Sequence, residues 1–185
     1  MQTYSAPLRW IHWITAALFI ATMLIGLYCG LQPAGTSPRR ELLDVHKSLG
    51  ETLLLLTLLR LAVRAVTAAP PQAVMNRLVR LAAGLNHVGL YVLLIAMPVT
   101  GYLYSSAGGY SLRYFWTFDL PRLFAGNRLV ASFGERSHDL LAWVVYATVA
   151  MHIGATIWHE AVKKDGTLAR MWPGRTGSGS ALDGS

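Results

Sequence analysis

Charged side chains are scarce in this sequence. Asp, Glu, Lys and Arg together make up 14% of the 185 residues, whereas roughly a quarter of an average soluble domain is charged. Apolar residues make up 54%, and the nine acidic residues are outnumbered by sixteen Lys and Arg. This composition disfavours an all-soluble helical bundle and favours a protein that is embedded in a membrane.

Cysteine is nearly absent as well. The single residue, Cys29, excludes an intrachain disulfide, and the chain has no Cys-x-x-Cys-His motif. Covalent attachment of a c-type haem is therefore not expected. The sequence also shows no nucleic-acid-binding module, so we interpret the basic excess as a membrane signature and expect no nucleic-acid partner.

Four apolar segments are present, over about 9–31, 45–66, 85–105 and 138–162. Each approaches the ~20 residues that a membrane-spanning helix needs. The first segment is not followed by an evident small-residue cleavage site, so we interpret it as a span rather than as a signal peptide. We predict an all-α fold, an integral membrane four-helix bundle that forms one domain over residues 1–175 and contacts membrane lipid. Residues 176–185, rich in Gly and Ser, read as a flexible tail or a residual linker.

The connection over 106–136 is the longest and is rich in aromatic residues and glycine. We expect it to contain a short amphipathic helix lying on the membrane, because loops of this length are often functional. Four spans place both termini on one side, which carries nine Lys and Arg against seven on the other. The positive-inside rule then predicts cytoplasmic termini.

Histidines recur at matched depths in these segments. In the last segment His138, His152 and His159 are separated by fourteen and seven residues, and at 3.6 residues per turn these steps return to nearly the same face. Fourteen residues span roughly 21 Å, so one histidine lies near each membrane surface. His12 opens the first segment at the depth of His152, and His46 opens the second at the depth of His138. Because an imidazole inside a membrane is costly, these two pairs indicate function.

Two imidazoles that face each other across a bundle can ligate one iron axially, an arrangement suited to electron transfer. Zinc is the competing metal, but a closed zinc site usually has four protein ligands, often including Cys. Gly26 lies on the face of His12 and either leaves room for a flat group or serves helix packing. Arg60, fourteen residues after His46, either snorkels to the interface or pairs with an acidic group of a cofactor.

Seven short stretches carry a family resemblance: Ile11-His12-Trp13, Val45–Gly50, Leu59–Arg64, Ile95–Gly101, Ser137-His138-Asp139, Met151-His152 and Lys164–Met171. They resemble the bacterial cytochrome b561 family of small di-haem four-helix membrane cytochromes, and within it the superoxide oxidase branch, over about residues 4–173. The resemblance implies two haems b. His12 and His152 would bind the inner iron, and His46 and His138 the outer iron. The acidic group that Arg60 would pair with is then a haem propionate.

The superoxide oxidase branch passes electrons from periplasmic superoxide through the haems to ubiquinone. The resemblance therefore implies a superoxide:quinone oxidoreductase of the bacterial inner membrane. Reduction of a quinone takes two electrons and two protons, and histidine suits the proton relay. This makes His87 and His159 candidates for a quinone site, the alternative being interfacial histidines satisfied by water or headgroups. Four outer arginines are candidates to steer the superoxide anion, although Asp119 and Glu135 are interspersed with them: Arg113, Arg122, Arg128 and Arg136.

Two other functions fit the same residues. An electron-carrier subunit would accept electrons from a periplasmic dehydrogenase or a soluble cytochrome and pass them to quinone. A channel or scaffold would contain no haem. A reduced-minus-oxidised spectrum distinguishes the last alternative, and haem reduction by superoxide without a partner protein separates the first two.

Overall fold

The computed structural model describes residues 3–68 and 76–174, so the tail proposed over 176–185 lies outside the described residues. Four long helices account for most of this part of the chain, which confirms the all-α prediction. Their bounds are α1 Ala6–Leu31, α2 Ser37–Val66, α3 Arg77–Gly108 and α4 Arg128–Trp158. A π-helical turn, His159–Lys163, continues α4, and a 3-10 turn, Leu168–Arg170, follows.

The helix ends follow from local signals in the sequence. A proline lies in the first turn of both α1 and α2, where the missing N–H costs no helical hydrogen bond. The side chains of Asn76 and Asn127 accept hydrogen bonds from the backbones of Val79 and Val130, and so cap α3 and α4. At the other end of α3, Gly109 adopts the left-handed conformation (φ 76°) that closes many helices.

Three of these helices are long and apolar enough to cross a membrane: α1, α3, and α4 extended to Lys163. Their most apolar stretches bury only 17%, 17% and 11% of their residues inside the protein. The outward faces carry large apolar side chains such as Leu24, Val92 and Trp143, which lipid can cover. The integral membrane character of the fold is thereby confirmed. Helix α2 contains the range 45–66 expected as the second span but is more highly charged and is not among the three.

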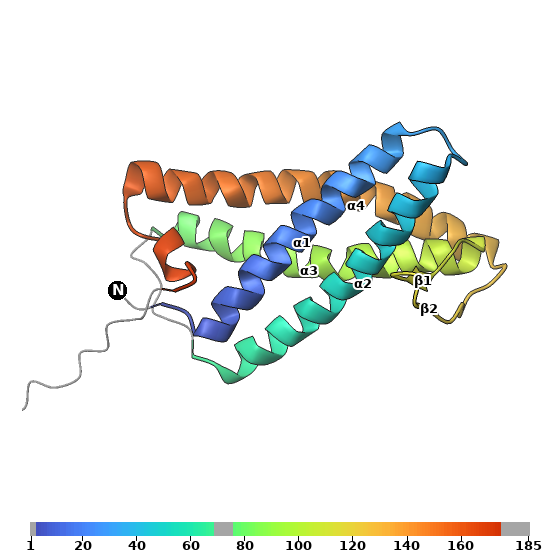
Figure 1. Ribbon diagram of the computed structural model, residues 1–185. Helices are drawn as coiled ribbons and strands as arrows, with labels where there is room; N and C mark the ends of the chain where they lie inside the picture. The colour runs from blue at the N-terminus through green and yellow to red at the C-terminus, as the bar shows by residue number, and fades with distance from the viewer. Residues whose placement is uncertain (1–2, 69–75, 175–185) are drawn as a thin grey trace, which may run out of the picture.

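Helices α3 and α4 run side by side, and α1 and α2 form a second pair that crosses them diagonally (Figure 1). The beginning of α1 and the turns after α4 lie at one end of the bundle, here called the inner end. The α1–α2 loop and the α3–α4 connection lie at the other, outer end (Figure 1). A small core of Leu93, Val145 and Val149 joins α3 to α4. At Gly134 a Cβ atom would lie 2.5 Å from the backbone nitrogen of Tyr104, so only glycine allows this close approach of α4 to α3.

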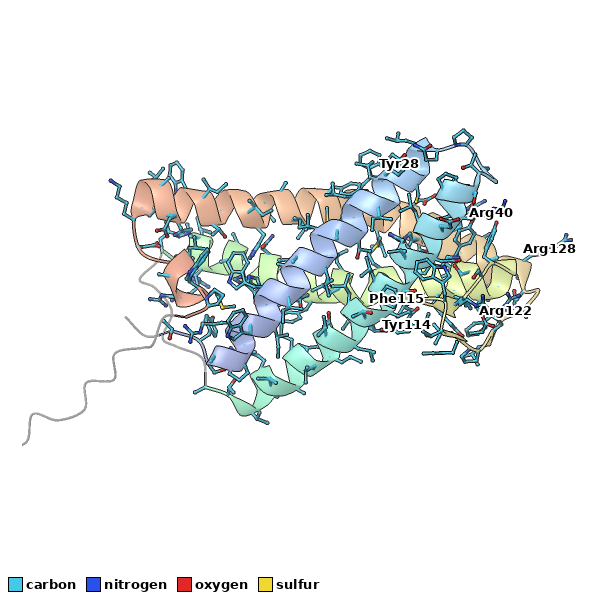
Figure 2. All side chains as sticks on the ribbon, in the orientation of Figure 1. Tyr28, Arg40, Tyr114, Phe115, Arg122 and Arg128 are labelled. Atoms are coloured by element: carbon cyan, nitrogen blue, oxygen red, sulfur yellow. The ribbon has the colours of Figure 1, made fainter. Side chains whose placement is uncertain are left out.

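The connection between α3 and α4 differs from the prediction. Helices α3 and α4 extend into the range 106–136 from both sides, and a two-stranded hairpin, β1 Arg113–Tyr114 and β2 Phe118–Asp119, lies between them. The prediction of a short amphipathic helix lying on the membrane is therefore wrong. The hairpin rests on α2, where the Ser48 hydroxyl accepts a hydrogen bond from the backbone N–H of Phe115 at 2.8 Å. Figure 2 shows Tyr114 and Phe115 against α2.

Candidate functional site

One histidine from α1 and one from α4 face each other at the inner end. The ring centroids of His12 and His152 are 6.4 Å apart, with an angle of 72° between the ring planes. Both side chains are half-buried. The matched depths expected from the sequence are thus realised by two helices that are distant along the chain.

A second pair lies at the outer end, between α2 and α4. The ring centroids of His46 and His138 are 6.2 Å apart and their planes meet at 82°. Because α4 contributes one histidine to each pair, the helix joins the two sites along its length. His152 lies fourteen positions after His138, which separates their Cα atoms by roughly 21 Å along the axis.

The spacing within each pair fits axial ligation of one metal ion. An imidazole nitrogen binds a first-row metal at about 2 Å, so two bonds, plus the distance from each nitrogen to its ring centre, place the centroids roughly 6 Å apart. Within the described part of the chain, no group of three or more His, Cys, Asp or Glu side chains could hold a metal ion. A closed zinc site is therefore not supported, whereas haem iron needs only two protein ligands.

Two glycines make room for the outer histidines. A Cβ atom on Gly26 would lie 2.8 Å from Cε1 of His46, and one on Gly101 would lie 3.2 Å from Cε1 of His138. The first contact is closer than real Cβ atoms come, and the second is tight. The space that Gly26 leaves is therefore occupied by the imidazole of His46.

Hydrogen bonds to oxygen atoms orient three of the four histidines. Nδ1 of His46 lies 3.0 Å from the Thr22 carbonyl oxygen, and Nδ1 of His138 lies 3.1 Å from that of Met97. A carbonyl oxygen only accepts, so Nδ1 carries the proton and Nε2 keeps its lone pair for a metal. Such partners of the distal ring nitrogen fix the orientation of a metal ligand and raise its basicity.

Asn86 supplies the third of these partners, and the sequence reasoning missed it. Its Oδ1 atom lies 3.3 Å from Nδ1 of His152, while its Nδ2 atom donates to the Thr148 carbonyl at 3.3 Å. The side chain is buried. A buried amide in an apolar segment was a usable signal, but it was overlooked beside the neighbouring His87.

His12 has a different partner. Nη1 of Arg60 donates to Nδ1 of His12 at 2.8 Å, and the guanidinium lies over the ring of Tyr91, 5.6 Å from its centroid. Nε of Arg60 is buried and has no hydrogen-bond partner among the described residues. An unsatisfied buried donor on a cation beside this histidine pair fits a carboxylate, such as a haem propionate.

The two quinone candidates lie in different surroundings. The ring of His87 lies 5.6 Å from that of His152, and its side chain is partly exposed. His159 is the first residue of the π-helical turn, and its Nδ1 lies 2.6 Å from Oδ2 of Asp165. Among the described residues, no ring contact or hydrogen bond joins His159 to His87. The structure therefore brings His87, but not His159, into contact with the inner pair.

Asp165 fixes the segment that follows α4. Burial opposes ionisation of its carboxyl, but hydrogen bonds from Thr167 and the contact with His159 outweigh this and hold its pKa below the usual value. The segment then returns to α1. Nε1 of Trp13 donates to the Met171 carbonyl at 2.8 Å, and Nη1 of Arg9 donates to that of Trp172 at 3.1 Å. The segment 164–174 thus covers the beginning of α1 directly beside His12.

The four arginines proposed to steer superoxide all lie toward the outer end; Figure 2 labels Arg122 and Arg128 there. Arg113 pairs with Asp119 across the hairpin at 3.5 Å, and both side chains are largely exposed. The structure adds a cation that the sequence reasoning did not select. Lys47 follows His46 directly, donates to the Ser111 carbonyl at 2.7 Å and lies within electrostatic range of Arg122.

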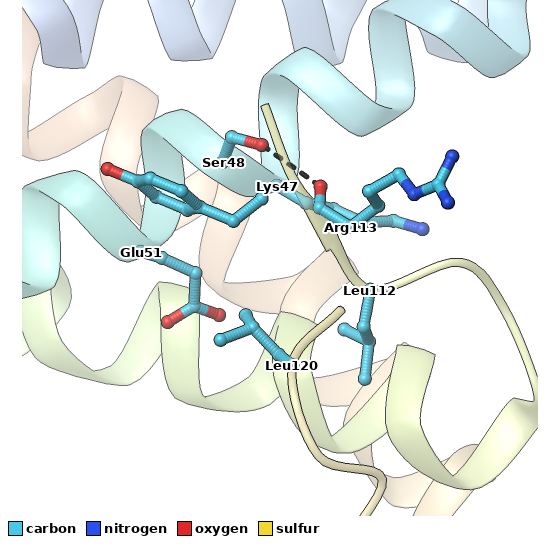
Figure 3. A pocket seen from close by; sticks show the side chains of 7 residues that line it. Lys47, Ser48, Glu51, Leu112, Arg113 and Leu120 are labelled. Carbon is cyan, nitrogen blue, oxygen red and sulfur yellow. Dashed lines mark hydrogen bonds between the residues drawn. The ribbon is translucent and has the colours of Figure 1, made fainter. Parts of the chain in front are cut away.

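A shallow pocket lies between α2 and the hairpin, one turn beyond His46 (Figure 3). The Ser48 hydroxyl donates to the Arg113 carbonyl at 3.3 Å, and the Thr52 hydroxyl lies 3.0 Å from the phenolic hydroxyl of Tyr114. These contacts hold the hairpin against α2, on the turns that follow His46. The lining residues are Lys47, Ser48, Glu51, Leu112, Arg113, Tyr114 and Leu120.

Comparison with known proteins gives a consistent result. Residues 3–174 match the family described as prokaryotic cytochrome b561. The chain is 32% identical over 161 residues to "Cytochrome b561 homolog 2" of Escherichia coli (strain K12), covering 86% of each protein. It is 28% identical over 182 residues to "Cytochrome b561 homolog 1" of the same organism, covering 95% of this chain and 99% of the relative. Identity to "Probable superoxide oxidase CybB" of Yersinia pestis is 29% over 179 residues, again covering 95% and 99%.

Proposed function

This chain belongs to the prokaryotic cytochrome b561 family of haem-binding membrane electron-transfer proteins, and on that premise we propose that it oxidises superoxide and reduces ubiquinone through two haems b. His12 and His152 would bind the inner iron, and His46 and His138 the outer iron. Each iron, when bound, cycles between two oxidation states and so carries one electron at a time. Two protein ligands to each iron would suit electron transfer rather than oxygen activation.

The observation that carries this proposal is the pairing of histidines at both ends of α4. Each pair has the spacing of two axial ligands, 6.4 Å and 6.2 Å between ring centroids. Helix α4 is long enough to cross a bilayer. A path between the two sites would therefore lead from one membrane surface to the other.

Electrons would enter at the outer end. One superoxide anion releases one electron and becomes molecular oxygen, so two anions are needed for each quinone. Lys47, together with Arg113, Arg122, Arg128 and Arg136, places positive charge at this end, which would attract a small anion. The relative named as a probable superoxide oxidase supports the same donor. The alternative is an electron-carrier subunit that accepts electrons from a periplasmic dehydrogenase or soluble cytochrome.

Electrons would leave at the inner end, where ubiquinone takes two electrons and two protons to form ubiquinol. His87 lies beside His152 and is partly exposed, so it can present a ring nitrogen to a quinone. His159 has its Nδ1 held by Asp165, which leaves Nε2 to pass a proton. The two histidines would act at separate positions rather than as one cluster.

The same proposal sets the orientation of the chain. Helix α2 would serve as the second of four spans, with its charged residues near its ends or facing the bundle. Both termini would then lie in the cytoplasm of a bacterium, with the outer histidine pair toward the periplasm. The larger number of Lys and Arg on the terminal side supports this orientation.

Haem content tests the ligand assignment. His12→Ala or His152→Ala should remove the inner haem and leave the outer one, because the iron loses an axial bond, and His46→Ala or His138→Ala should do the reverse. A pyridine-haemochrome assay on the purified protein should find two haems per chain in the wild type and one in each variant. Two haems in any of these variants would refute the assignment.

A further inference from the structure

Arg60 distinguishes the inner histidine pair from the outer one. The other three histidines of the two pairs have Nδ1 next to an oxygen acceptor, whereas Nδ1 of His12 faces a guanidinium nitrogen at 2.8 Å. Arg60 is half-buried in α2 and lies over the ring of Tyr91. It therefore places a positive charge directly beside one prospective axial ligand.

This contact and iron coordination through Nε2 exclude each other. A guanidinium has donors and no acceptor, so the contact requires Nδ1 of His12 to be unprotonated. A neutral imidazole has one N–H, which then lies on Nε2. Coordination by Nε2 instead places the proton on Nδ1, and two donors would face each other. Arg60 must therefore turn away from His12 when Nε2 binds iron. A carboxylate of the haem is a suitable new acceptor, because Nε of Arg60 is buried and has no partner in the described part of the chain.

The charged side chains around the two histidine pairs also differ, and the inner pair again has the more positive surroundings. Arg60 lies within electrostatic range of all three inner histidines, including His87. At the outer pair, Lys47 lies within range of His46 and Asp139 within range of His138. Charges of opposite sign offset each other there, whereas among the described residues no carboxylate of the protein lies within such range of the three inner histidines.

We infer that Arg60 is a positioning residue that exchanges His12 for a haem carboxylate and makes the inner haem the stronger electron acceptor of the two. A fixed positive charge near an iron stabilises the added electron and so raises the reduction potential. Electrons that enter at the outer end would then collect at the inner end, beside the proposed quinone site. This inference rests on the two-haem function proposed above.

This inference is tested by redox titration of the purified protein, in which the haem absorption bands report the reduction potential of each haem. Arg60→Gln should shift the electron equilibrium away from the inner haem about tenfold, which is about 59 mV for a one-electron couple. The outer haem should keep its potential. Arg64→Gln is the matched control, since Arg64 lies one turn further along α2 and is exposed. An unchanged inner potential in Arg60→Gln, or an equal shift in Arg64→Gln, would overturn the inference.

Two further variants keep the test decisive. Arg60→Lys retains the charge and should keep the inner potential near that of the wild type. If Arg60→Gln does not retain the inner haem, Asn86→Asp replaces it, because a carboxylate hydrogen-bonded to His152 opposes the charge of Arg60. It should lower the inner potential, and an unchanged potential would overturn the inference. Haem content is read separately: fewer than two haems in the wild type would refute the proposed function instead.

Discussion

Oδ1 of Asn86 lies 3.3 Å from Nδ1 of His152, and this contact ties α3 to a prospective ligand on α4. The amide of Asn86 also donates to the Thr148 carbonyl, one turn before His152. One buried side chain thus fixes both the orientation of the His152 ring and the nitrogen that would remain available for iron.

The first prediction follows from this contact. Asn86→Leu removes the acceptor for Nδ1 of His152, so the affinity for the inner haem should fall about 10- to 100-fold. Competition for haem with a soluble haem-binding protein measures the loss. Asn76→Leu is the control, because Asn76 caps the same helix at its end and should leave both affinities unchanged. Equal effects of the two substitutions would show that Asn86 acts only through helix stability.

A methyl group on Gly26 should disturb the outer site selectively. Its Cβ would lie 2.8 Å from the His46 ring, so Gly26→Ala must displace the imidazole, at a cost of about 1–3 kcal/mol. The absorption spectrum should show loss or distortion of the outer haem with the inner haem retained. Gly30→Ala, one turn later on α1, meets no atom within 4 Å and should leave the spectrum unchanged. Identical spectra for the two variants would contradict the geometry of the outer pair.

The ends of the bundle illustrate what the sequence could predict. Helical periodicity placed His138 and His152 on one face of one helix, and the apolar segments predicted four helices that the structure contains. The depths of His12 and His46 followed from their places at the start of the apolar segments, although α2 itself begins at Ser37, well before His46. These predictions rest on apolar segments and helical periodicity, both of which can be read directly from a sequence.

The hydrogen-bond partners of the histidines were harder to predict from the sequence. The carbonyls of Thr22 and Met97 are backbone groups, so no residue type at those positions reveals them. The contact between Arg60 and His12 joins α2 to α1 and depends on how the two helices cross. The hairpin between α3 and α4 was missed because its tip has Phe115 and Trp116 in the left-handed region (φ 40° and 60°), where turn signals favour Gly and Asn.

Substitution of the two quinone candidates should slow the exit of electrons without changing the haems. His87→Ala or His159→Ala should leave both haem spectra intact and slow haem reoxidation by added ubiquinone, because a hydrogen-bond or proton partner of the quinone is lost. Stopped-flow absorbance measures the rate. Because no contact joins the two residues in the described structure, their effects should be nearly independent. If the reoxidation rate is unchanged in both single variants and in the double variant, His87 and His159 are interfacial histidines without a role in quinone reduction.

The attachment of the segment 164–174 to the beginning of α1 should depend on pH through Asp165. The pKa of its carboxyl is below the usual value in the folded protein. Its contribution to stability is therefore complete above the pKa of the unfolded chain and is lost as the pH falls through the folded value. Trypsin cleavage after Lys163 or Lys164 should be faster in Asp165→Asn than in the wild type at neutral pH. Glu160→Gln, an exposed carboxylate in the same turn, is the control, and equal protection in Asp165→Asn and the wild type would contradict the role of Asp165.

The most direct test of the central claim is reduction of the haems by pulsed superoxide with no partner protein present. We expect rapid reduction of the outer haem followed by electron arrival at the inner haem. The rate constant should be higher at low ionic strength, because salt screens the outer cations over a Debye length of ~10 Å at 0.1 M. His46→Ala, which should lack the outer haem, provides the baseline. Reduction no faster than in that variant would contradict superoxide oxidation and leave the electron-carrier function in its place.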